Sequence, residues 1–140
     1  MKRLFAALAL LVCVGLFFSG CSMKADVQKA DTSVTRFHTQ LDGQDYASIY
    51  NEADSRFRGA SKLDDFLALM KAVHSKLGNV QSSTQQTYFV NYNTSGSTIR
   101  IVYATKFAGG DAREEFIWAK SGDKVQLLSY NINSNALITK

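Results

Sequence analysis

The chain has 140 residues, of which 46% are hydrophobic, 20% are charged and 11% are aromatic. This is the composition of a single globular domain, and it excludes an intrinsically disordered chain. The formal charge is +4, but Lys2 and Arg3 lie in a segment that we expect to be removed, so 14 basic residues face 12 acidic ones and leave +2. A charge excess this small predicts no nucleic-acid partner.

The first 20 residues have the layout of a secretory signal peptide. Lys2 and Arg3 precede an uncharged apolar run, residues 4–18, and the small residues Ser19 and Gly20 follow it. The alternative is a membrane-spanning helix, because residues 4–20 just reach the lower limit of about 17 apolar residues that a span requires.

Residues 18–21, Phe-Ser-Gly-Cys, resemble the lipobox of bacterial lipoproteins. The resemblance implies cleavage before Cys21, diacylglycerol on the Cys21 thiol and acylation of the new N-terminus. The protein is then held on a membrane of the bacterial cell envelope by this lipid. Ser22 resembles the residue found in lipoproteins sorted to the outer membrane, in cells that have two membranes.

The lipobox divides the chain into three parts. Residues 1–20 form the signal peptide, residues 21–28 the lipidated N-terminus and a short tether, and residues 29–140 a single α+β domain. Cys13 is expected to leave with the signal peptide, so the mature domain keeps no free thiol and forms no disulfide. Packing alone must stabilise it.

Three helices are predicted in chain order. Residues 25–41 place apolar side chains at spacings of three and four, and Asp42-Gly43 supplies a stop. Residues 44–53 predict a short second helix, and residues 54–59 an irregular segment. The third helix follows Ser61, its expected cap in a capping box with Asp64, and ends at Gly78. Its apolar stripe consists of Leu63, Phe66, Leu67, Met70, Val73 and Leu77.

From Val80 onward the apolar period changes from 3.6 to 2. Four alternating segments are separated by turns at residues 93–96, 108–111 and 121–123, which predicts antiparallel hairpins. The expected fold class is α+β: two or three N-terminal helices packed on a four-stranded, curved antiparallel sheet.

This order of elements resembles the cystatin-like and nuclear-transport-factor-2-like architectures. Particular segments are also similar to a family of small bacterial lipoproteins known only as domains of unknown function. The similarity covers residues 34–137 and implies a fold and a location, but no catalytic motif. It rests on residues 37–50 (FHTQLDGQDYASIY), Phe57, residues 66–67, 77–78 and 94–96, and residues 130–134 (YNINS).

The sequence contains no recognisable catalytic or metal-binding pattern. His38 and His74 lie on predicted helices with no cysteine near either, so we predict no metal and no cofactor. We interpret both as surface or boundary histidines, and keep His74, beside core residue Val73, as a candidate cavity residue. The pair Glu114-Glu115 points to opposite faces of a strand, so it is not predicted to be an acid/base dyad.

Aromatic side chains dominate one face of the predicted sheet. Two interpretations stay open: an aromatic core beneath the helices, or a ligand pocket. The face carries Tyr88, Tyr92, Tyr103, Phe107, Phe116, Trp118 and Tyr130. The pocket would be formed by Tyr88, Tyr92, Tyr103, Trp118 and Tyr130, together with His74.

The opposite face is more apolar than a solvated face should be. Phe89, Val102, Ile117 and Leu127 are therefore the candidate contact with a second copy or with an envelope protein. The alternative is that residues 135–140 or the N-terminal helix cover them.

Three functions follow, in order of preference. The first is a non-catalytic envelope domain for protein interaction or envelope assembly. The second is small-molecule binding in an aromatic cavity between sheet and helices, and the third is an enzyme with a cone-shaped pocket, which rests on fold analogy alone. A filled core favours the first, whereas an open cavity favours the second. A buried acid beside an open cavity favours the third.

Overall fold

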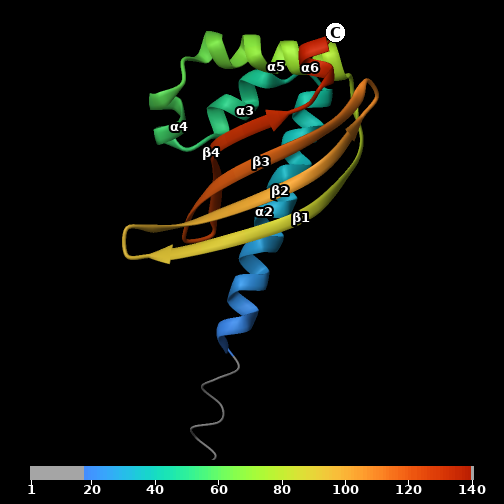
Figure 1. The fold of residues 1–140 in the computed structure, drawn as a ribbon. Coiled ribbons are helices and arrows are strands. Elements are labelled where there is room, and N and C mark those ends of the chain that lie inside the picture. The colour runs from blue at the N-terminus through green and yellow to red at the C-terminus, as the bar shows by residue number, and fades with distance from the viewer. Residues whose placement is uncertain (1–17, 140) are drawn as a thin grey trace, which may run out of the picture.

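The structure is a computed structural model, which describes residues 18–139 (Figure 1). The helices α2 (Phe18–Asp42), α3 (Tyr46–Glu52), α4 (Ser55–Ala60) and α5 (Leu63–Leu77) precede four strands. The strands are β1 (Val80–Asn93), β2 (Gly96–Phe107), β3 (Gly110–Ser121) and β4 (Lys124–Asn133), and a short helix, α6 (Ala136–Thr139), follows them. The predicted α+β class is confirmed.

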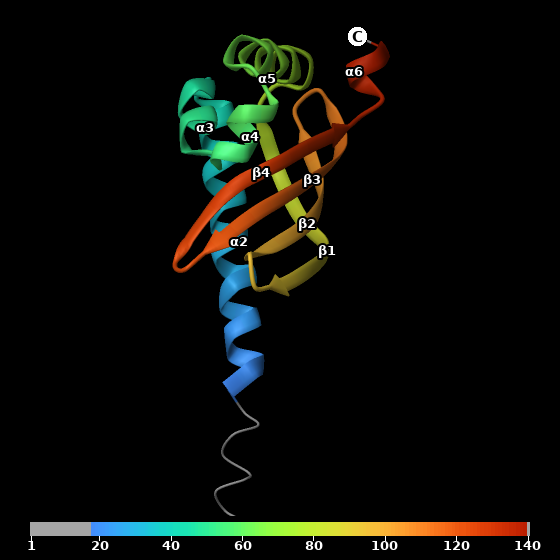
Figure 2. The same ribbon diagram turned by 90° about the vertical axis from the view of Figure 1, so that its left-hand side faces the viewer.

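The sheet is antiparallel and its strand order, β1-β2-β3-β4, follows the chain order. It is curved and not closed. Helix α2 crosses its inner face, while α3, α4 and α5 gather at one end (Figures 1 and 2). At that end Gly109 brings the β2–β3 turn against α5: its N–H donates to the Leu77 carbonyl over 2.7 Å. A Cβ on Gly109 would lie 2.7 Å from the Lys76 carbonyl oxygen, so only glycine fits this approach.

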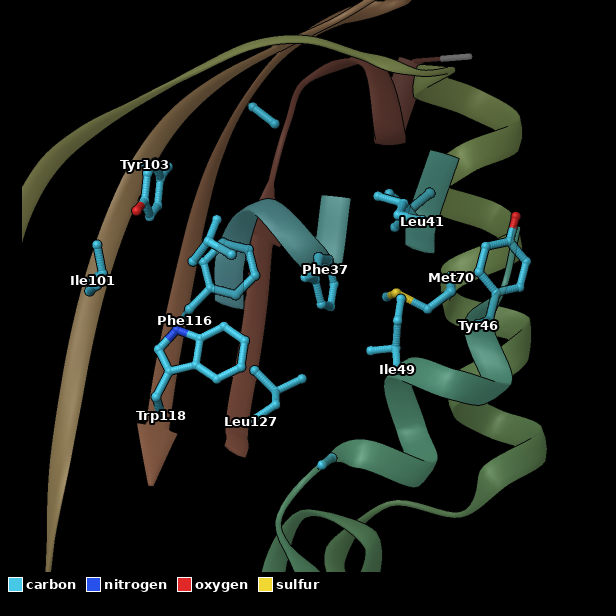
Figure 3. Close-up of a cluster of buried hydrophobic side chains, with 14 of the residues drawn as sticks. Phe37, Leu41, Tyr46, Ile49, Met70, Ile101, Tyr103, Phe116, Trp118 and Leu127 are labelled. Carbon is cyan, nitrogen blue, oxygen red and sulfur yellow. The ribbon is translucent and has the colours of Figure 1, made fainter. Parts of the chain in front are cut away.

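The core forms where the predicted apolar stripes meet the inner face of the sheet (Figure 3). Helix α2 contributes Ala30, Val34, Phe37 and Leu41, and α5 contributes Phe66, Met70, Val73 and Leu77, all buried. The sheet supplies Ile99, Ile101, Tyr103, Phe107, Phe116, Trp118 and Leu127. Leu63, which was expected in the α5 stripe, is 39% exposed at the start of that helix.

Two helix predictions need correction. Residues 54–59 were expected to be irregular, but Ser55–Ala60 form α4, because the Asp54 carboxylate caps this helix by accepting from the Arg56 N–H over 2.9 Å. Ser61 does not cap α5; its N–H donates to the Phe57 carbonyl and so ends α4. Lys62 is the N-cap of α5 and makes no side-chain cap bond, although Gly78 ends the helix as predicted.

Helix α2 also starts earlier than residue 25. It runs without a break from Phe18 through residues 21–28, so the expected tether is helical. Asp26 is 4% exposed and Val27 packs against the core, which means that the second half of that tether is already part of the domain.

Candidate functional site

The structure separates the residues of the predicted pocket. Tyr103 and Trp118 are buried in the core, at 3% and 5% exposure. Tyr88 and Tyr92, by contrast, are 52% and 51% exposed on the edge strand β1. His74 lies on α5, where its Nε2 is 2.8 Å from the Asn79 Oδ1. These residues therefore do not line one common cavity.

The aromatic side chains at the centre fill the interior by packing on one another. The Phe116 ring stacks on Trp118 with ring centroids 5.9 Å apart, and Phe37 from α2 meets Phe116 edge-on at 5.1 Å. Tyr130 lies 4.7 Å from the Phe37 ring. The cavity beside Phe37 and Trp118 has a volume of about 90 Å³, well below the roughly 300 Å³ at which ligand pockets begin.

Sequence reasoning missed a buried polar cluster under α2. Glu114 from β3 has no exposed surface, yet its carboxylate has three partners. Its Oε2 lies 2.7 Å from His38 Nε2 on α2 and accepts from the Thr105 hydroxyl over 2.6 Å. Its Oε1 accepts from the Tyr130 hydroxyl over 2.7 Å. A carboxylate this deep is retained only with such partners.

The pattern that could have found Glu114 was the alternation already used for its neighbours. Phe116 and Trp118 face the core, and a period of two places Glu114 on the same side of β3. Its register partner on β2 is Tyr103, whose ring is also inside. Only the negative charge of Glu114 favoured an outward position. In the fold, His38 and Tyr130, which are distant in sequence, bond to this carboxylate and allow it to be buried.

Burial and neighbouring carboxylates affect the phenols of this region. Burial, followed by the adjacent Glu114, raises the pKa of Tyr130 well above its ordinary value. Burial and the hydrogen bond that Tyr103 donates to Asp31 raise the pKa of Tyr103 as well. Both phenols therefore stay neutral at physiological pH and act as hydrogen-bond donors.

The carboxylate and the imidazole of this cluster are buried away from solvent. A carboxylate, an imidazole and a phenol in contact are groups that acid/base catalysis uses. However, Glu114 is 0% exposed and His38 is 7% exposed. Glu114 is enclosed and His38 nearly so, and their bond joins α2 to the sheet. Within the described residues, no group of three or more His, Cys, Asp or Glu is arranged to hold a metal ion.

The open part of the molecule is β1, an edge strand that pairs only with β2. Every residue of β1 is exposed except Val80 and Val90, which are half-buried. The strand contains neither a charged residue nor a proline. Natural edge strands are usually protected from other chains by lysine, proline or a cover. The bulges of β1 lie before Thr87, so residues 87–93 form a regular, unprotected edge.

The geometry of the β1–β2 turn determines which backbone groups of this edge do not bond to β2. Asn93 pairs with Gly96 across a two-residue turn, and such a turn closes on a hydrogen-bonded pair. Because bonded and non-bonded positions alternate along an antiparallel pair, Tyr88, Val90 and Tyr92 direct their N–H and C=O groups away from β2. These groups are available to an added strand.

A groove lies beside the edge, between β1 and the N-terminal half of α2. It has a volume of about 430 Å³. Its walls mix apolar and polar side chains from the helix with Gln85 and Tyr88 from the strand. The helix contributes Met23, Lys24, Val27, Gln28 and Asp31.

The other edge strand, β4, is covered. The Asp54 N–H, just before α4, donates to the Leu127 carbonyl over 2.9 Å. Gln126 Nε2 also donates to the Glu52 carbonyl over 3.1 Å. The segment that joins α3 to α4 therefore occupies the edge that a foreign strand would need.

The four predicted interface residues do not share one exposed face. Phe89 is 65% exposed and Ile117 is half-buried on the outer face, while Val102 is only 5% exposed there. Leu127 lies in the core at 3% exposure, because a register shift between Ile117 and Trp118 reverses its side. The alternative, that residues 135–140 cover this face, does not hold for the described part of that segment: α6 packs on α5, where Lys76 Nζ donates to the Leu137 carbonyl.

The predicted signal peptide lies outside the described residues apart from the backbone of its last part, and so does the side chain of Cys21. Among the helices that the structure describes, none combines the length and apolar character that crossing a membrane requires.

A family model matches residues 33–130 of the chain, which include the C-terminal part of α2, the Glu114 cluster and all of β1. The chain belongs to this family, which is described as a protein of unknown function (DUF4019). No curated protein matches the chain in sequence.

Proposed function

We propose that this protein is a lipid-anchored protein of the bacterial cell envelope, whose domain binds an extended segment of another envelope protein at β1. The observation that carries the proposal is the uncharged, regular edge at residues 87–93, beside the groove under α2. The bound segment would add a strand to the sheet, and the domain itself would be non-catalytic. The order of helices and strands supports the resemblance to cystatin-like and nuclear-transport-factor-2-like domains.

The lipid anchor is supported by the sequence. A short basic start, an uncharged apolar run and two small residues precede Cys21. Three acyl chains on Cys21 would make attachment stable, since two chains already suffice. Ser22 supports the outer membrane as the destination in a cell with two membranes.

Strand addition is supported by the chemistry of the edge. The outward N–H and C=O groups of Tyr88, Val90 and Tyr92 would bond to the main chain of the bound segment. Alternate side chains of that segment would point into the groove, where they meet Val27 and Met23. Because β1 carries no charge, a partner strand of low charge fits best, and exposed tyrosines favour such contacts.

The filled interior argues against the other two functions. A small-molecule site at the centre of the sheet, under α2, would need space that the stacked aromatic side chains occupy, because the cavity beside Phe37 and Trp118 has a volume of only about 90 Å³. An enzyme would need access to Glu114, which α2 and the sheet enclose. Strand addition requires neither.

Photo-crosslinking in cells tests the binding site. A photo-reactive amino acid replaces Tyr92 in the full chain, and Leu69, 48% exposed on α5, is the matched control position. We expect crosslinks to an extended segment of a protein from position 92 and not from 69. Val90→Pro removes one outward N–H, which an edge strand tolerates, and should abolish the product. Equal crosslinking from both positions, or a product that Val90→Pro leaves unchanged, would contradict strand addition.

A separate experiment tests the anchor. Labelling cells with a fatty-acid analogue should mark the wild-type protein and Cys13→Ser, but not Cys21→Ser, which should remain an uncleaved precursor. Unlabelled wild-type protein that starts upstream of Cys21 would contradict the lipid anchor. It would not affect the crosslinking result, which tests the binding site alone.

A further inference from the structure

We infer that the end of the domain formed by the β1–β2 and β3–β4 turns rests on an anionic phospholipid surface. The inference depends on the lipid anchor of the proposed function, and it adds a second, non-covalent contact with the same membrane. Two observations support the inference: the two turns lie beside the start of α2, and the net positive charge of the domain is located at the same end.

The first step is geometric. The Tyr92 hydroxyl, just before the β1–β2 turn, donates to Asp26 Oδ2 over 3.1 Å. Lys29 Nζ lies 2.6 Å from Asp123 Oδ1 in the β3–β4 turn. Both turns are therefore fixed beside residues 26–29 of α2, and Figures 1 and 2 show them as the parts of the sheet nearest the N-terminal end of that helix.

The second step is the distance to the anchor. Helix α2 is continuous from Phe18, so Cys21 and Asp26 lie on one helix without a hinge between them. Five residues of helix rise about 7.5 Å. Eight residues, from Cys21 to Lys29, rise about 12 Å. A lipid on Cys21 would thus hold the β1–β2 turn beside Asp26 within about one Debye length of the head groups at physiological salt, and the β3–β4 turn beside Lys29 within about one and a half.

The third step is the charge at this end. It carries Lys24, Lys29, Lys120 and Lys124 against Asp26 and Asp123, a net charge of +2. The chain after residue 20 has 14 basic and 12 acidic residues, so the whole net charge of the mature protein lies here and the remainder is balanced. This positive charge is complementary to anionic lipid, the surface beside which the anchor would hold this end.

Two of these lysines are paired and two are available. Lys29 pairs with Asp123, and Lys120 Nζ lies 3.5 Å from Asp26 Oδ1. Lys24 and Lys124 are exposed and, within the described part of the chain, form no ion pair with a carboxylate. A lysine near an anionic membrane strengthens binding about fivefold. Lys24 and Lys124 are accordingly the residues that should make the contact.

The test uses the processed, full-length protein reconstituted into vesicles. Thr94→Cys places a thiol in the exposed β1–β2 turn, and an environment-sensitive fluorophore is attached to it. We expect a blue shift of emission in vesicles that contain phosphatidylglycerol, no shift in pure phosphatidylcholine, and reversal by high salt. Lys24→Gln with Lys124→Gln should abolish the shift. The matched control, Lys62→Gln with Lys71→Gln at the α5 end, should retain it.

Each failure has a separate meaning. Two outcomes would overturn this inference and leave the anchor intact. In the first, the protein floats with vesicles but its emission is the same in both lipids. In the second, the control pair of substitutions abolishes the blue shift as fully as Lys24→Gln with Lys124→Gln does. Absence of flotation with either kind of vesicle would overturn the anchor, and the inference with it.

Discussion

The centre of the sheet and its β1 edge contain the same kinds of residues in opposite environments. At the centre, Tyr103 donates its hydroxyl hydrogen bond to Asp31 on α2 and Tyr130 donates to Glu114 on β3, and the ring of Phe116 between them is buried. At the edge, Tyr88 and Phe89 are mostly exposed, although residues 87–93 pair with β2 without a register shift. The difference shows that the helices close one part of the sheet and leave β1 available.

The largest expected effect is at the centre. Glu114→Ala should lower the free energy of unfolding by about 3–5 kcal/mol, because it leaves buried donors on His38, Thr105 and Tyr130 without an acceptor. Urea unfolding, followed by the fluorescence of Trp118, the one tryptophan, measures it. Glu115→Ala is the control: it removes a surface ion pair with Arg100 and should cost less than about 1 kcal/mol. Equal losses would mean that the cluster does not hold the centre.

A smaller effect is expected in alkaline solution. The folded state raises the pKa of Tyr130 and of Tyr103, so it favours their neutral forms. That stability is fully present below the unfolded pKa of about 10 and is lost as pH rises above it, by about 1.4 kcal/mol per pH unit for each phenol.

Tyr130→Phe should therefore reduce the slope of unfolding free energy against pH above about pH 10 by about 1.4 kcal/mol per unit. Tyr103→Phe should reduce it similarly. Denaturant unfolding at a series of pH values measures both slopes. An unchanged slope in Tyr130→Phe would show that its hydroxyl ionises as freely in the folded protein as in the unfolded one.

The smallest effect is expected at the edge. Phe89→Ala and Tyr88→Ala should each change the free energy of unfolding by no more than about 0.5 kcal/mol, as exposed positions do. Phe116→Ala, the matched change at the centre, should cost about 3–5 kcal/mol. Comparable losses at Phe89 and Phe116 would show that something covers the edge in the isolated protein.

Much of the fold could be predicted because long periodic runs define it. The α5 stripe and the four alternating segments give their elements and the strand order directly. Helix α4 could not be predicted in the same way, since it has only six residues and depends on its Asp54 cap and on bonds from Arg58 to the Asn51 and Ala53 carbonyls. Leu127 was placed on the wrong face because a register shift interrupts the alternation on which the prediction relied.

The site was harder to predict than the fold. Sequence alternation places Tyr88, Tyr92 and Tyr103 on one face, but only the position of each strand in the sheet decides which are covered. His38 was interpreted as a surface or boundary histidine, because its partner Glu114 lies 76 residues away in the chain. The open edge also depends on which strand the helices leave uncovered, a property of the assembled fold.

The strand order has a kinetic consequence. Each strand pairs with the next across a short turn, so the sheet can form without closing a long loop. Docking of α2 is different, since His38 and Glu114 are far apart in sequence and their contact requires most of the chain to be in place. We expect the hairpins to form before α2 docks. Variants of His38 should then speed unfolding while leaving the folding rate nearly unchanged, which stopped-flow measurements across denaturant concentrations can establish.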